Sequence, residues 1–125
     1  MNPREPDVSL SAEQFKSIIQ SLKSDRPGNG SFEKRASPRV GLRAKITVYP
    51  GGDTTKPREV WVRDLSSTGI GVVHSEAFNA GADFLVCFPL RATDHLWVYY
   101  RVMHCRSISP KLYFTGAKLK YIEER

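Results

Sequence analysis

Cysteine is scarce in this sequence, which has only Cys87 and Cys105 among its 125 residues. The chain contains no Cys-x-x-Cys pair and no His-x-x-x-His spacing, the patterns that preorganise a tetrahedral metal site. Both cysteines lie in apolar, strand-like runs, which is typical of small buried side chains in a reduced protein. We therefore expect no disulfide, no metal centre and no cofactor.

Long apolar runs are also missing. No stretch approaches the roughly 18 apolar residues that a transmembrane helix needs. The polar N-terminus has no apolar segment of the signal-peptide kind. We therefore expect a cytoplasmic protein without membrane insertion, and a chain of this length is sufficient for one domain with a real core.

The motifs of common enzyme active sites are missing as well. The chain has no Gly-x-Ser-x-Gly, no Walker phosphate loop and no His-Glu-x-x-His. Its carboxylates are scattered and do not pair for acid–base catalysis. A binding protein, not an enzyme, is therefore expected.

Acidic residues are few in the segment where basic residues gather. The formal net charge is +6. Residues 1–31 hold four basic and four acidic side chains, whereas residues 32–63 hold eight basic and three acidic ones. This excess predicts an anionic partner, such as a phosphate group or an acidic surface, although solvated surface charge would give the same count.

The N-terminal part predicts a disordered tail followed by one helix. Residues 1–10 contain prolines and show no periodicity. Ser11 and Gln14 then form a capping-box pattern. Apolar residues follow at helical spacing, namely Phe15, Ile18, Ile19 and Leu22. We expect an amphipathic helix over residues 11–25, whose apolar stripe packs on the following domain or on a second copy of the chain; we favour the first.

After a linker and basic loop over residues 26–41, the apolar residues alternate, as in half-buried strands. Turn-forming residues divide this part into six runs. The predicted strands cover residues 42–49, 58–63, 70–74, 83–90, 95–108 and 112–122. Because the connections have hairpin length and no helical period separates the runs, we expect a mainly β protein, a six-stranded antiparallel barrel over residues 42–125. Gly116, inside the last run, predicts a bulge or a close approach.

A pair of arginines precedes the first predicted strand. Arg35 and Arg39 follow Lys34, and Pro38 between them disfavours a helix, so a loop is expected. A guanidinium group can bind phosphate through two hydrogen bonds and can stack on an aromatic ring. Two arginines four residues apart are a weak signal alone, because the chain contains eleven arginines.

A polar turn with the pattern Asp64-x-Ser66-x-x-Gly69 follows the second predicted strand. It can be a plain turn in which Asp64 caps its own backbone. It can also bind a ligand: a carboxylate accepts two hydrogen bonds from the N1–H and N2–H₂ edge of guanine, and Ser66 can bond to the base or to a phosphate. Gly69 permits close backbone approach. The hairpin between the two motifs should bring them together.

In this order and spacing, the two motifs resemble those of the PilZ domain family. The resemblance covers about residues 32–122 and includes residues 115–119, which are similar to the closing glycine strand of that family. It implies a six-stranded barrel that binds the bacterial second messenger cyclic di-GMP. Many members end in a helix beside the barrel, whereas this chain has an N-terminal helix instead.

The resemblance also implies a role for each motif residue. Arg35 and Arg39 would clasp the phosphates and guanine faces. Asp64 and Ser66 would recognise a guanine edge, and Gly69 would shape the turn. Lys34, which precedes the first arginine, keeps the binding of a stacked pair of nucleotides possible.

The sequence thus predicts a bacterial single-domain cyclic di-GMP receptor, monomeric or homodimeric, that acts as an adaptor. Binding is expected to order the loop over residues 33–39, and the N-terminal helix is our candidate for the element that engages an unidentified partner protein. One alternative is a basic barrel that binds single-stranded nucleic acid through Trp97, Tyr99 and Arg101. We favour packing of those residues under the N-terminal helix. A second alternative is a PilZ-like interaction module that binds no nucleotide.

Overall fold

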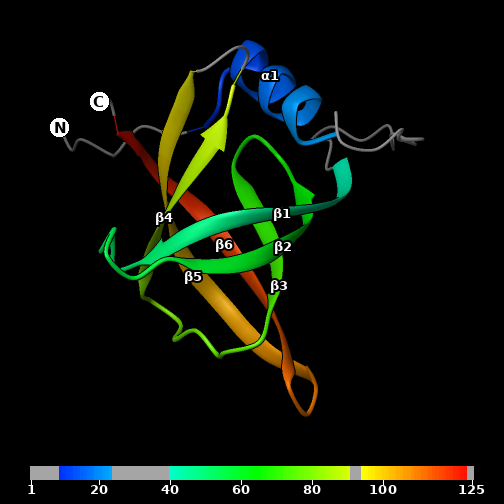
Figure 1. Ribbon diagram of the computed structural model, residues 1–125, viewed down its shortest axis with the longest axis vertical. Coiled ribbons are helices and arrows are strands. Elements are labelled where there is room, and N and C mark those ends of the chain that lie inside the picture. The colour runs from blue at the N-terminus through cyan, green and yellow to red at the C-terminus, as the bar shows by residue number, and fades with distance from the viewer. Residues whose placement is uncertain (1–8, 24–39, 91–93, 124–125) are drawn as a thin grey trace, which may run out of the picture.

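The structure is a computed structural model that describes residues 9–23, 40–90 and 94–123. Six antiparallel strands close into a barrel, and one helix lies at one end of it (Figure 1). The elements are α1 (Ala12–Lys23), β1 (Val40–Pro50), β2 (Arg58–Leu65), β3 (Gly69–His74), β4 (Asp83–Pro89), β5 (His95–Ser109) and β6 (Leu112–Glu123). The predicted six-stranded barrel with an N-terminal helix is confirmed.

The strand order around the barrel is β1-β2-β3-β6-β5-β4, and β1 closes the ring by pairing with β4. Strand β6 therefore lies between β3 and β5, while residues 75–82 connect β3 to β4 around one end of the barrel (Figure 1). Strand β1 begins at Val40, within the predicted linker, and β2 extends to Leu65, because Val40 pairs with Leu65. The rest of the predicted basic loop lies outside the described residues.

The interior is apolar and follows the predicted alternation. On β2, Val60 and Val62 are buried while Trp61 is half exposed. On β5, Val98 and Val102 are buried on the same side. Each such side chain contributes roughly 1.5–3 kcal/mol by leaving water, before conformational entropy is subtracted.

Both cysteines are half-buried, and not buried as predicted. Cys87 pairs with Trp97 and lies on the outer side of β4, between Val86 and Phe88, which point inward. Cys105 follows a register shift in β5 and accepts the N–H of Phe78 at 3.5 Å. The alternation of Phe84, Val86 and Phe88 already places Cys87 on the outer side of β4.

Helix α1 begins with the predicted capping box. The Ser11 N–H donates to Gln14 Oε1 at 2.8 Å, and the Gln14 N–H donates to Ser11 Oγ at 3.0 Å. Ile18, Ile19 and Leu22 are buried in the same apolar cluster as the barrel interior. The helix therefore packs on its own barrel, against β1 and β4. In the described part of the chain, no helix has the length and apolarity required to cross a membrane.

A backbone hydrogen bond attaches the start of this helix to the turn between β2 and β3. The N–H of Leu10, which is itself buried, donates to the carbonyl oxygen of Ser67 at 2.8 Å. On the other side of the turn, the Leu119 N–H donates to the Thr68 carbonyl oxygen at 2.8 Å. The turn is thus held between the helix and β6.

His74 is a buried polar residue at the end of β3. Its Nδ1 lies 2.6 Å from the Glu76 carbonyl oxygen, and its Nε2 lies 2.6 Å from Thr115 Oγ1. Because a carbonyl oxygen only accepts, Nδ1 carries the proton, and the neutral ring accepts the Thr115 hydroxyl proton at Nε2. Burial lowers the pKa of His74, and the positive charge of Arg58 lowers it further.

We predict that this histidine makes the barrel less stable in acid. The unfolded chain binds a proton at His74 near its ordinary pKa of about 6.5, whereas the folded chain binds it only at lower pH. Stability is therefore full above about pH 6.5 and is lost as the pH falls toward the lowered folded pKa. Urea unfolding at pH 7.5 and 5.5 should show a smaller pH effect in His74→Gln than in the wild type. His95→Gln, at an exposed histidine, should keep the wild-type pH effect; equal pH effects in all three proteins would contradict the prediction.

A second prediction concerns Tyr100, a fully buried residue in the barrel interior. Its hydroxyl has no hydrogen-bond partner among the described residues. Burial of an unpaired hydroxyl costs about 1–3 kcal/mol. Tyr100→Phe should therefore raise the free energy of unfolding by about 1 kcal/mol in urea titrations, whereas Tyr121→Phe on the surface should change it by less than about 0.5 kcal/mol. A destabilised Tyr100→Phe variant would show that the hydroxyl is paired.

Candidate functional site

The turn between β2 and β3 is closed by Ser66. Its N–H donates to the Gly69 carbonyl oxygen at 3.0 Å, and its Oγ accepts the N–H groups of Gly69 and Thr68 at 3.1 and 3.3 Å. The alternative that Asp64 caps this turn is therefore wrong. The Asp64 carboxylate is half-buried and has no hydrogen-bond or ion-pair partner within residues 9–23, 40–90 and 94–123.

A shift in strand register turns Asp64 to the outer side of the barrel. Val60 and Val62 point inward, so strict alternation would also place Asp64 inside. The pairing of β2 with β3 shifts between Val62 and Asp64, and Leu65, not Asp64, is fully buried. Such bulges re-aim side chains. Arg63 and Asp64 consequently lie on the outer side together.

A second register shift, in β5, turns His104 to the outer side of the barrel. On β5, Val102 is buried and the pairing with β6 shifts between Val102 and His104. Both Met103 and His104 are exposed as a result. The two bulges place a carboxylate and an imidazole on the outer surface at positions where the alternation predicts inward-facing residues.

Paired residues connect these two side chains across the sheet. From β1 to β5 the row reads Gly41, Asp64, Gly71, Gly116 and His104. Two adjacent glycines thus form a strip of bare backbone between Asp64 and His104. This strip is the floor of a pocket of about 350 Å³, whose lining also includes Ser66, Gly69, Phe114 and Lys118.

A side chain at either glycine of the floor would displace the side chains beside it. A Cβ atom at Gly71 would lie 2.9 Å from Asp64 Oδ1 and 3.0 Å from Phe114 Cζ. A Cβ atom at Gly116 would lie 2.6 Å from His104 Nε2. The close approach predicted at Gly116 is therefore confirmed, although the register shift beside it lies in β5.

Of the residues predicted to form a site, the turn brings together Asp64, Ser66 and Gly69. Lys34, Arg35 and Arg39 lie outside the described residues. The sequence analysis missed Gly71, Phe114 and His104, which line the same pocket. The Gly69-x-Gly71 spacing was an available signal for Gly71, but the other two depend on strand pairing.

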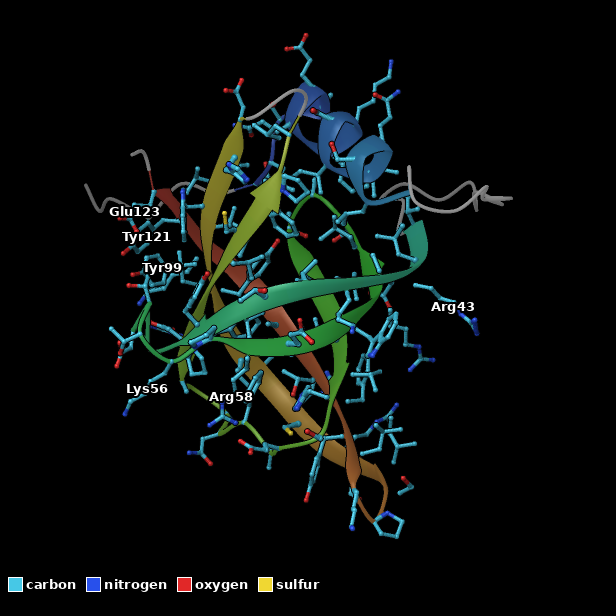
Figure 2. All side chains as sticks on the ribbon, viewed as in Figure 1. Arg43, Lys56, Arg58, Tyr99, Tyr121 and Glu123 are labelled. Carbon is cyan, nitrogen blue, oxygen red and sulfur yellow. The ribbon has the colours of Figure 1, made fainter. Side chains whose placement is uncertain are left out.

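A separate aromatic group lies on β1, β5 and β6, outside the pocket. The rings of Tyr99 and Tyr121 lie 4.8 Å apart, and those of Tyr49 and Trp97 lie 6.0 Å apart. Tyr99 and Tyr121 lie on the opposite side of the view from Arg43 (Figure 2). Trp97 and Tyr99 on β5 thus pack against aromatic rings of β1 and β6, whereas the helix packs mainly against β1 and β4 rather than on β5 as predicted.

Arg101, the basic residue of the predicted nucleic-acid site, is paired with a carboxylate. Arg101 Nε lies 3.2 Å from Asp83 Oδ1, and Lys120 Nζ lies 2.7 Å from Asp83 Oδ2. Lys120 and Arg101 lower the pKa of the Asp83 carboxyl group, so it stays ionised. A single-stranded nucleic acid would have to compete with this carboxylate for Arg101.

In a comparison with protein families, residues 33–123 match the PilZ domain. Among solved structures, the chain is similar to the Bacillus subtilis inhibitor of motility (MotI/DgrA), with a TM-score of 0.53 and 15% identity over 73% of this chain and 44% of that one. It is also similar to MrkH of K. pneumonia, solved as a complex with c-di-GMP, with a TM-score of 0.46 and 17% identity over 71% of this chain and 45% of that one. The chain thus spans less than half the length of either protein. The comparison with curated proteins gives no match.

The glycine that ends the turn gives a testable prediction. A Cβ atom at Gly69 would lie 3.0 Å from the backbone carbonyl oxygen of Ala117. Gly69→Ala should therefore lower the free energy of unfolding by about 1–2 kcal/mol, because β3 and β6 must move apart. At Gly41, on the same face, the nearest atom lies 4.0 Å away, so Gly41→Ala should be neutral or stabilising. Equal effects in urea unfolding would contradict the importance of this contact.

Proposed function

The chain belongs to the PilZ domain family, and on this premise we propose that it is a receptor for cyclic di-GMP. The observation that carries the proposal is the half-buried Asp64 carboxylate, which has no partner among the described residues and faces a pocket with a glycine floor. A carboxylate in this position can accept both hydrogen bonds of the guanine N1–H and N2–H₂ edge. Charge-assisted bonds of this kind are about twice as strong as neutral ones.

The neighbouring groups suit a flat base. Gly71 and Gly116 leave the strand backbone uncovered, so a base can approach it closely. Ser66 accepts two backbone N–H groups through Oγ, and its hydroxyl proton remains available as a donor. The pocket therefore combines an anionic acceptor, a hydroxyl donor and a flat floor.

We propose that the basic residues Lys34, Arg35 and Arg39 contribute contacts to phosphate. Val40, the covalent neighbour of Arg39, pairs with Leu65, and Gly41 pairs with Asp64. The chain that carries the arginines therefore joins the barrel next to Asp64. Guanidinium groups bind phosphate through two parallel hydrogen bonds and stack on purine rings.

We also propose that the receptor acts through a partner protein. In this view nucleotide binding orders the loop over residues 33–39, and the ordered loop together with α1 presents the surface that the partner reads. Hydrogen exchange of residues 33–39 with and without cyclic di-GMP tests this step. Unchanged exchange in the saturated protein would contradict it.

Isothermal titration with cyclic di-GMP tests the receptor proposal. We expect wild-type binding at micromolar or lower concentration, and a loss of at least about tenfold in Asp64→Asn, because one charged acceptor is removed. Arg39→Ala should abolish measurable binding, and GMP should not bind. Asp53→Asn is the matched control, since that exposed carboxylate bonds to Thr55 at the tip of the β1–β2 hairpin.

Two results would contradict the proposal. One is no heat with the wild-type protein. The other is equal affinity in Asp64→Asn and Asp53→Asn. Binding that falls steeply with salt and accepts any oligonucleotide would instead support the nucleic-acid alternative.

A further inference from the structure

Two arginines contact one aromatic ring, Phe114, which lines the pocket. The Arg63 Cζ lies 5.0 Å from the centre of the Phe114 ring, and the Arg106 Cζ lies 5.5 Å from it. Arg63 lies on β2, and Arg106 lies on β5, where it pairs with Phe114 of β6. In the strand order, β6 lies between β2 and β5. We call Arg63, Phe114 and Arg106 the arginine pair and its ring.

The two guanidinium groups have no anionic partner in the described part of the chain. No ion pair or hydrogen bond joins either one to a residue in 9–23, 40–90 or 94–123, and both side chains are exposed. Lys45 offers a contrast on the same outer surface. It lies over the Trp61 ring at 5.4 Å and also pairs with Glu59 at 3.6 Å. Lys45 on its ring thus has a carboxylate partner, whereas Arg63 and Arg106 on theirs have none among the residues that the structure describes.

The arginine pair belongs to the same pocket as Asp64. The tip of the Phe114 ring leans over Gly71, where a Cβ atom would meet both Phe114 Cζ and Asp64 Oδ1. Arg63 is also the residue before Asp64, and because the register shift in β2 turns Asp64 outward, both lie on the outer side. A ligand whose base reaches Asp64 therefore has its remaining groups close to this ring.

The chemistry of the pair fits a phosphate group. A guanidinium group that contacts a ring through its face keeps its N–H donors free at its edge. The ring restricts both side chains, so less rotamer entropy is lost when they bind. An anion that accepts hydrogen bonds from both guanidinium groups also reduces the repulsion between them.

We propose that Arg63 and Arg106, held on Phe114, bind one phosphate of the nucleotide. This inference rests on the proposed cyclic di-GMP function. It assigns one of the two phosphates of cyclic di-GMP to the arginine pair. Recognition of both phosphates would exclude mononucleotides from tight binding.

Titration calorimetry with cyclic di-GMP on Arg63→Gln, Arg106→Gln and the double variant tests the proposal. Each single variant should weaken binding about tenfold, and the double variant more, because charged hydrogen bonds to phosphate are lost. Lys45→Gln is the matched control: it removes one charge from the same surface and should change affinity less than about twofold. Phe114→Leu should weaken binding while both arginines remain, and thermal unfolding would verify that it folds.

Phosphorus NMR of the bound nucleotide adds a readout that a general loss of charge does not give. In the wild-type complex the two phosphates should have different chemical shifts, and Arg106→Gln should move one of them. If the wild-type protein binds cyclic di-GMP and the arginine variants match Lys45→Gln, the phosphate assignment is wrong and the receptor function stands. If the wild-type protein does not bind, the receptor function itself is overturned, and the assignment with it.

Discussion

Closure of the barrel depends on three residue pairs between β1 and β4: Val48 with Val86, Tyr49 with Leu85, and Pro50 with Phe84. Without them, β1 and β4 would each expose a row of unpaired N–H and C=O groups. Closure also gives every strand one inner and one outer side, so the position of a residue along its strand decides whether it meets the core or the solvent. A residue at an inward position of the alternation can point outward only if the strand register shifts locally.

The site is built from such departures. Asp64 and His104 both stand where alternation would bury them, and a bulge beside each turns it outward. Burial of an ionised carboxylate inside the apolar barrel would destabilise the fold, and the bulge in β2 avoids this by turning Asp64 toward the solvent. The strip of Gly71 and Gly116 then separates the two side chains without covering the backbone. The same constraint that forms the core thereby determines the shape of the outer pocket.

Much of the fold could be predicted from the sequence, because the inward residues of a half-buried sheet repeat every two positions. The capping box at Ser11 and the alternation of Val60 with Trp61 are local signals, and both are confirmed. The site could be predicted only in part. Asp64, Ser66 and Gly69 are close in sequence, whereas Phe114 and His104 reach the pocket through pairing with distant strands. Register shifts leave no clear mark in the pattern of apolar residues, so neither bulge could be placed.

The bond from the Leu10 N–H to the Ser67 carbonyl oxygen has a consequence for how the helix and the pocket respond to each other. The turn contacts both the pocket and the segment before α1. The Ser66 side chain lines the pocket, and the Ser67 carbonyl oxygen accepts the hydrogen bond from Leu10, which leads into α1. Free-energy coupling between two sites is reciprocal. A molecule that removes α1 from the barrel therefore also releases one support of the turn, and whatever tightens the turn makes removal of α1 harder. The position of the helix and the conformation of the pocket are thus coupled through this one turn.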